Sequence, residues 1–149
     1  MTQEEKDLLL KDLCARLPYG VKANSRDGKK TITITPIAIA NFMSGAIDII
    51  KPYLRPMSSM TEEEKKELVN HVLGGKGAEF FHVTKDGSID GNQEAEQDLL
   101  KMELHWINFS PETASCYLEW LYKKQFDVNG LIPLDLAIEV TESNNPYKD

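Results

Sequence analysis

The sequence of 149 residues predicts an α+β fold, and three local patterns carry the prediction. The segments 2–5 (TQEE) and 61–64 (TEEE) are capping boxes, in which a Thr hydroxyl and a Glu carboxylate each accept an otherwise orphaned backbone N–H at a helix start. An Asp-Gly pair at 27–28 precedes the alternating run at 31–35, and glycine takes the positive φ that a hairpin turn requires. We therefore expect a small antiparallel sheet packed against three to four helices.

The remaining elements follow from periodicity and from proline and glycine positions. Pro36 interrupts the second hairpin strand, so the apolar run after it is expected to form an edge strand or a bent continuation of the hairpin. A short helix is expected over 46–52. The segment 93–105 combines a helical stripe with strand-like alternation near its end, and its composition favours helix. The predicted elements are helix 3–16, hairpin 19–35, strands near 37–42 and 78–85, and helices 61–73, 93–105 and 111–125.

The chain length and the short loops indicate one domain over 1–149, with a polar tail at 141–149 that we expect to fray. The formal net charge of −7 argues against nucleic acid and against an anionic membrane as partners. No run of about 20 apolar residues is present to span a bilayer. The acidic N-terminus is unlike a secretory signal, and the protein is expected to be cytoplasmic, with Cys14 and Cys116 as free, buried thiols.

The turn-rich segment 86–92 (DGSIDGN) partly matches a calcium-binding loop. Asp86, Ser88 and Asp90 place oxygen atoms at loop positions one, three and five, and a glycine follows at position six. The match fails at position twelve, where Gln97 replaces the bidentate Glu. An ordinary hairpin or loop is therefore the favoured interpretation, and calcium is kept as the alternative cofactor.

No pattern in the sequence indicates catalysis. The three histidines (His71, His82 and His105) lack the spacing that sets two imidazoles on one metal. Phosphate-binding glycine loops and nucleophile elbows are also missing from the sequence. Whether the protein is an enzyme stays open, and the balance favours a non-catalytic protein.

Candidate binding residues come from two parts of the chain. Trp120 lies at the border of the apolar face of the last helix, where such a residue more commonly covers a loop of the same chain and alternatively anchors a partner. Phe126 belongs to the same group of aromatic residues near the C-terminus. In the loop before 61, the side chains of Arg55, Ser58 and Ser59 have no evident structural task. These five residues are the predicted binding residues.

Three segments resemble one known family. The matching segments are 13–22 (LCARLPYGVK), 51–67 (KPYLRPMSSMTEEEKKE) and, more loosely, 117–139. The family that they resemble consists of small proteins of anaerobic gut bacteria and of their phages and mobile elements. That family carries an HFDYRGLI-type segment after a late helix, and here Gln125, Val128 and Asn129 stand where His, Tyr and Arg are usual. The resemblance implies a phage or mobile-element context, and it brings no activity, ligand or catalytic residue with it.

Two functions follow as expectations. The first is a non-catalytic accessory protein that acts through contacts with a protein partner, whose identity and oligomeric arrangement the sequence does not give. The alternative is a small metal-dependent protein or enzyme with a site near the 86–92 acidic loop.

Overall fold

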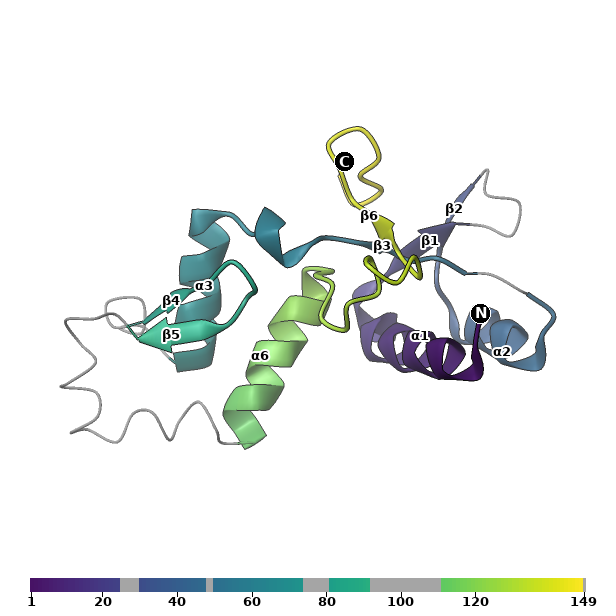
Figure 1. Ribbon diagram of the computed structural model, residues 1–149, viewed down its shortest axis with the longest axis horizontal. Helices are drawn as coiled ribbons and strands as arrows, with labels where there is room; N and C mark the ends of the chain where they lie inside the picture. Colours follow the sequence, from purple (N-terminus) through teal and green to yellow (C-terminus); the bar gives the residue numbers. More distant parts are fainter. Residues whose placement is uncertain (25–29, 48–49, 74–80, 92–110, 149) are drawn as a thin grey trace. The chain divides into compact units, whose positions relative to one another are not determined.

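The computed structural model describes residues 1–24, 30–47, 50–73, 81–91 and 111–148, which combine helices with pairs of short strands (Figure 1). The predicted α+β class is confirmed. By its internal contacts the chain divides into two compact units. Unit 1 comprises Met1–Pro56 and Tyr122–Asp149, and unit 2 comprises Met57–Leu121. One domain over 1–149 stays a prediction.

Unit 1 begins with α1 (Gln3–Arg16), and the predicted capping box is present at its start. The Glu5 backbone N–H donates to the Thr2 hydroxyl at 3.1 Å, and the Thr2 N–H donates to the Glu5 carboxylate at 2.8 Å. The helix is followed by a short 3-10 turn, η1 (Leu17–Tyr19). Leu9 and Leu13 are fully buried on one face of α1, whereas Cys14 is exposed, contrary to the expected burial of this thiol.

The second helix of unit 1, α2 (Pro36–Ser44), replaces the strand predicted near 37–42. The Thr35 hydroxyl caps this helix by accepting the Ala38 N–H at 3.2 Å, and Pro36 occupies the first helical turn. Proline suits that position because its missing N–H has no intrahelical acceptor there. Gly45 closes the helix with a φ of 84°. The prediction was wrong because it read Pro36 as a strand breaker rather than as a helix start.

The strands of unit 1 form two pairs. β1 (Lys22–Asn24) and β2 (Thr31–Thr33) are antiparallel, which confirms the arms of the predicted hairpin, and the turn between them at 25–29 lies outside the described residues. β3 (Tyr53–Leu54) and β6 (Ile138–Glu139) are parallel, a pair that the sequence did not predict. The helix expected over 46–52 is wrong for the described residues of that range, since 46–47 and 50–52 are not helical.

The core of unit 1 lies where α1, α2 and these strands meet. Its apolar side chains come from both ends of the chain, since the last of them follow α6 in sequence. The fully or almost fully buried members are Leu9, Leu13, Val21, Ala23, Ile34, Ile39, Phe42, Ile50, Leu54, Leu131, Leu136 and Ala137. Tyr147 also belongs to this unit, and its hydroxyl donates to the Tyr53 carbonyl at 2.8 Å. The tail predicted to fray at 141–149 is therefore attached at this residue.

Unit 2 contains η2 (Met57–Ser59), α3 (Glu62–Leu73), the antiparallel pair β4 (Phe81–Val83) and β5 (Ile89–Gly91), and most of α6 (Pro111–Lys123). The second predicted capping box is confirmed, because the Glu64 N–H donates to the Thr61 hydroxyl at 3.1 Å. β4 confirms the strand predicted near 78–85 where it is described. The helix predicted over 93–105 lies outside the described residues.

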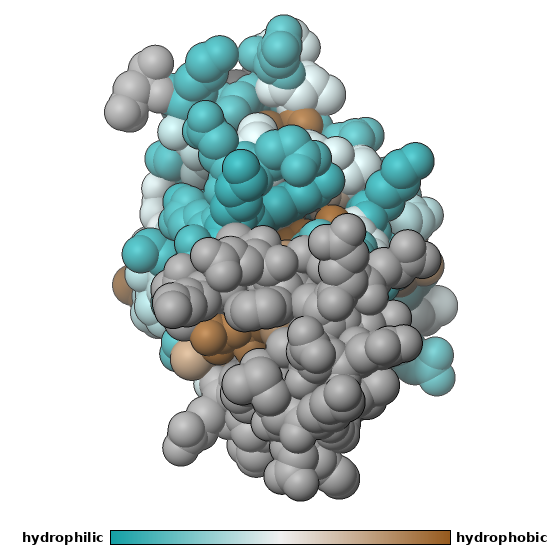
Figure 2. All heavy atoms as spheres, turned by 90° about the vertical axis from the view of Figure 1, so that its left-hand side faces the viewer, coloured by the Kyte–Doolittle hydropathy of each residue, from teal (hydrophilic) through white to brown (hydrophobic). Residues whose placement is uncertain are grey.

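The apolar side chains described on α3 and β4 of unit 2 are largely covered. Leu68, Val69, Phe81 and Val83 are buried, and they lie on α3 and β4. On the face drawn in Figure 2, hydrophilic residues cover most of the described surface and hydrophobic ones show only in small areas.

Candidate functional site

The loop before α3 and the loop after α6, both singled out by the sequence, meet within unit 1. The Arg55 N–H donates to the Gln125 carbonyl and the Asp127 N–H donates to the Arg55 carbonyl, each at 2.8 Å. The Arg55 guanidinium lies 4.2 Å from the centre of the Phe126 ring, and Phe126 is fully buried. A cation over an aromatic face is attracted by the negative potential of the ring. Both candidate residues therefore make contacts inside the protein.

A buried ion pair on α1 lies beside this junction, and it was not among the predicted site residues. The Arg16 Nε donates to the Asp12 Oδ1 at 2.6 Å, and both side chains have no exposed surface. Arg16 Nη2 donates to the Phe126 carbonyl at 2.5 Å, and the guanidinium carbon lies 4.9 Å from the centre of the Tyr122 ring. The signal that sequence reasoning missed is the i, i+4 spacing of Asp12 and Arg16 on the apolar side of the helix.

Two side chains of the loop between α6 and β6 (124–137), which we call the late loop, complete this network. We call the network the polar core and define it as Asp12, Arg16, Gln125 and Asn129. Asn129 Nδ2 donates to Asp12 Oδ2 at 2.9 Å, and Gln125 Nε2 donates to the Tyr19 carbonyl at 3.1 Å. Within the described part of the chain, Arg16 Nη1 and Gln125 Oε1 are buried without a hydrogen-bond partner. The polar core thus joins α1 to the late loop and is closed to solvent at Asp12 and Arg16.

The late loop is also held from within. The Asp127 carboxylate accepts the backbone N–H groups of Leu131 and Ile132 at 2.8 and 2.9 Å. Further on, Asp135 has a φ of 58°, and this left-handed turn leaves Leu134 exposed while Leu136 is buried. The loop presents one leucine outward as a result of this geometry.

Tyr147 belongs to the C-terminal segment of unit 1 and lies near Asp12 and Arg16 of the polar core. Its hydroxyl accepts the Lys22 N–H at 3.0 Å and donates to the Tyr53 carbonyl. Burial raises the pKa of Tyr147 to about 12, because the phenolate would lose hydration there. The side chain is neutral under ordinary conditions and serves as a hydrogen-bonding bridge between β1 and β3.

The acidic segment of unit 2 forms the turn of the β4–β5 hairpin. The Asp86 carboxylate accepts hydrogen bonds from the Thr84 hydroxyl and the Ser88 N–H. These bonds, the one from Thr84 above all, hold the pKa of Asp86 below its usual value. Asp90 points to solvent from β5. Asp86 and Ser88 thus belong to the turn and Asp90 to the strand that follows it, and the described part of the segment is a hairpin, one of the two structures favoured over a calcium loop.

The other predicted binding residues belong to unit 2. Trp120 is 4% exposed, and its indole N–H donates to Glu67 at 3.4 Å, so it lies inside rather than on a surface. Ser58 and Ser59 are exposed on η2. Arg55 and Phe126 meet in unit 1, whereas Ser58, Ser59 and Trp120 lie in unit 2. The five predicted residues therefore belong to different units.

The most unusual surface of unit 1 is the outer side of α2. This helix contains no charged residue, and Ile37 and Met43 are 73% and 61% exposed. Ala40 is exposed between them. We call these three side chains the α2 face. The sequence signal was available, since PIAIANFMS is uncharged, but it was assigned to a strand.

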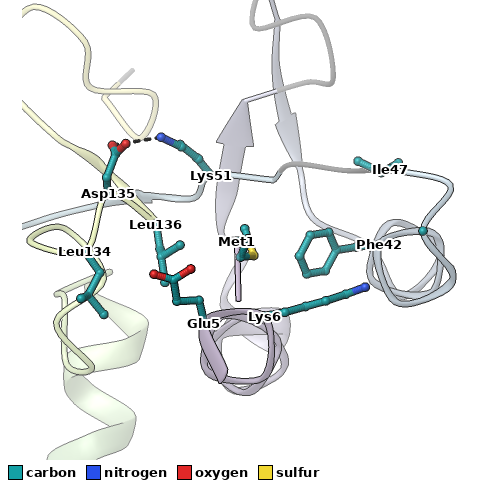
Figure 3. Close-up of a pocket in the computed structure, with 10 residues that line it drawn as sticks. Met1, Glu5, Lys6, Phe42, Ile47, Lys51, Leu134, Asp135 and Leu136 are labelled. Atoms are coloured by element: carbon teal, nitrogen blue, oxygen red, sulfur yellow. Dashed lines mark hydrogen bonds and ion pairs between the residues drawn. The ribbon is translucent and has the colours of Figure 1, made fainter. Parts of the chain in front are cut away.

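A groove of about 550 Å³ lies between α1, α2 and the late loop (Figure 3). Phe42 reaches into it from α2, and Lys6 of α1 extends beneath the ring with its ammonium 5.3 Å from the ring centre. Lys51 and Asp135 form an ion pair at 2.9 Å along its edge. The lining residues are Met1, Glu5, Lys6, Phe42, Gly45, Ile47, Lys51, Leu134, Asp135 and Leu136.

In the described ranges, no three His, Cys, Asp or Glu side chains are grouped so that they could hold a metal ion. His71 and His82 lie on α3 and β4, and His105 is outside these ranges. None of the described helices is both long enough and apolar enough to cross a membrane. No protein-family model, curated protein or solved structure matches the chain.

Proposed function

We propose that this chain is a non-catalytic accessory protein that binds a protein partner through the α2 face. The observation that carries the proposal is the exposure of Ile37 and Met43 on a helix without a charged residue. A solvated helix face usually carries charged side chains, and an exposed apolar patch is typical of a protein interaction site. Burying such a patch against a partner removes apolar surface from water.

The contacts of Asp12, Arg16 and Asp86 are structural, which supports the binding role. Asp12 and Arg16 are closed to solvent and paired with each other, so their charges serve packing. Asp86 is engaged in its own turn. The metal-dependent alternative thus gains no specific support from the 86–92 segment.

The proposed binding surface differs from the binding residues that were predicted from the sequence. Phe126 and Trp120 are buried, so a partner would not reach them in this conformation. The α2 face, in place of these two residues, is the proposed contact with the protein partner. A phage or mobile-element origin and a cytoplasmic location belong to the same proposal, supported by the resembling segments and by the acidic charge of −7.

The test is a comparative capture from extracts of the source organism. The bait is the wild type, the double variant Ile37→Glu/Met43→Glu, or Leu118→Glu, a matched control that places the same charge on a 38% exposed leucine of α6. We expect wild type and control to capture the same specific protein and the double variant to lose it. Identical captured proteins for all three baits would contradict the proposal.

A further inference from the structure

We propose that Asn129 is a site of spontaneous chemical modification, in which its side-chain amide is converted to a carboxylate and the polar core is loosened. The chemistry of this site does not depend on the proposed function. Asn129 and Gly130 form the only Asn-Gly pair in the sequence. An asparagine followed by glycine is the arrangement most prone to intramolecular loss of ammonia, because glycine has no Cβ to hinder the approach of its backbone nitrogen.

The backbone around this pair is open to the reaction. Gly130 has a φ of 70°, and nothing lies within 4 Å of the position that a Cβ would take there. Asn129 and Gly130 are both partly exposed, so water reaches the reacting groups. Among the described residues, none accepts a hydrogen bond from the Gly130 N–H. The attacking nitrogen therefore has no such contact to give up.

The reaction needs only water as a co-reactant. The Gly130 backbone nitrogen attacks Cγ of Asn129, a new C–N bond forms, and the bond from Cγ to Nδ2 breaks. The Gly130 N–H proton is lost to solvent, and the departing Nδ2 takes up a proton and leaves as ammonia. Water then opens the resulting five-membered succinimide at either of its carbonyl groups. The products are aspartate and isoaspartate, and each carries one negative charge more than asparagine.

The new charge would lie against a buried carboxylate. Asn129 Nδ2 donates to Asp12 Oδ2 at 2.9 Å, and the Asp12 side chain has no exposed surface and is paired with Arg16. A carboxylate at position 129 loses this hydrogen bond, because an oxygen replaces the donor nitrogen. It also sets two anions against the single guanidinium of Arg16, and like charges close together in a buried setting are destabilising. Modification therefore weakens the contact between α1 and the late loop.

Isoaspartate also alters the main chain. Its backbone runs through the former side-chain carbonyl and contains one extra methylene group at position 129. The Asp127 carboxylate accepts the Leu131 and Ile132 N–H groups at 2.8 and 2.9 Å, and these bonds close over position 129. A longer main chain between donor and acceptor changes their spacing. Both products therefore disturb the late loop, aspartate by its charge and isoaspartate by its charge and its length.

The experiment follows every asparagine of the purified full chain during incubation at pH 8 for several weeks. Peptide mass spectrometry measures the converted fraction of each one. We expect Asn129 to be the first asparagine converted, although its bond to Asp12 restrains the amide and makes the reaction slower than in a free peptide. In the matched control, Asn129→Gln, the amide is kept but would have to close a less favourable six-membered ring, so position 129 should stay unchanged. Asn129 that is still intact at the end of the incubation, or after another asparagine has been converted, would overturn the inference.

The effect on the polar core is measured on the same material. Ion-exchange chromatography separates converted from unconverted protein by the added negative charge. We expect the converted fraction to melt about 4 °C or more below the unconverted one, and the directly prepared variant Asn129→Asp to show a similar loss. Asn41→Asp adds the same charge at an exposed position of α2, and we expect it to melt within about 2 °C of the wild type.

The converted fraction of the wild type decides if Asn129→Asp does not fold, because this fraction forms from protein that has already folded. A lower melting temperature of the converted fraction, with Asn41→Asp unchanged, supports the loosening of the polar core. Equal melting temperatures of the converted and unconverted fractions, or an equal loss in Asn41→Asp, would overturn it.

Discussion

Arg16 is a charged residue that behaves as a core residue. Its guanidinium contacts Asp12, the Phe126 carbonyl and the Tyr122 ring, and the side chain has no exposed surface. A charged side chain is tolerated in a protein core only when it is paired and hydrogen-bonded, because its desolvation costs several kcal/mol. Asp12 lies on the same helix as Arg16, whereas Tyr122 and Phe126 lie more than 100 positions further along the chain.

The first prediction concerns this pair. Arg16→Met leaves the Asp12 carboxylate buried without its cation, and we expect a loss of roughly 3–5 kcal/mol in the free energy of unfolding. The double variant Asp12→Leu/Arg16→Met removes both charges and should be more stable than Arg16→Met alone. Urea denaturation at pH 7 measures both values. A double variant less stable than Arg16→Met would contradict the role given to the pair.

The second prediction concerns alkaline pH. The folded pKa of Tyr147 is raised to about 12 from 10.0, so its stabilising effect is complete below pH 10 and is lost as pH rises through 12. We expect Tyr147 to account for a fall of roughly 2–3 kcal/mol in unfolding free energy across that window. In Tyr147→Phe this part of the fall should be missing. Parallel stability curves for the two proteins between pH 10 and 12 would contradict the assignment.

At the scale of elements, some helix starts and strands were predicted correctly from the sequence, whereas α2 was not. The capping boxes at 2–5 and 61–64 and the hairpin arms were predicted correctly because their signals are local. The helix at Pro36–Ser44 was missed although Thr35-Pro36 is a local helix start, since Pro36 was interpreted as a residue that interrupts a strand. The parallel pairing of β3 with β6 joins segments more than 80 residues apart, and no local pattern specifies it.

The candidate site was predictable only in part. Arg55 and Phe126 were both predicted as binding residues, and their side chains contact each other. Their contact is internal, which depends on burial and therefore on the complete fold. The exposed surface of α2 became visible only once its helical form assigned Ile37 and Met43 to the outside.

The third prediction is that the α2 face is not needed for folding. Ile37 and Met43 have few apolar contacts to lose, because most of their surface is already in water. Substitutions at exposed positions usually change stability by less than about 0.5 kcal/mol. We therefore expect Ile37→Glu/Met43→Glu to unfold in urea at nearly the wild-type midpoint. A loss of about 2 kcal/mol or more would identify the α2 face as part of the packing instead.

At the scale of the whole molecule, unit 2 is one continuous segment inserted into unit 1. The insertion begins after Pro56 and ends before Tyr122, and the bridge between Arg55 and Phe126 holds the flanking residues of unit 1 together. Unit 1 contains its own apolar core and the whole polar core. These features indicate that unit 1 carries what it needs to fold.

The fourth prediction follows from that organisation. We expect a chain in which 57–121 are replaced by a Gly/Ser linker of about eight residues to unfold cooperatively. Arg16→Met in the shortened chain should reduce its stability, as in the full chain. Far-ultraviolet circular dichroism is the suitable probe, because the replaced segment contains both tryptophans. A broad transition that Arg16→Met does not shift would show that unit 1 depends on unit 2.

The central claim is that the α2 face binds a protein partner, and site-specific photo-crosslinking tests it most directly. Benzoylphenylalanine is placed at position 37 or, as a control, at position 118 of the full chain, and each protein is irradiated in extracts of the source organism. We predict a discrete crosslinked product of higher mass from position 37 and none from position 118. No discrete product from position 37, or the same product from both positions, would contradict the claim.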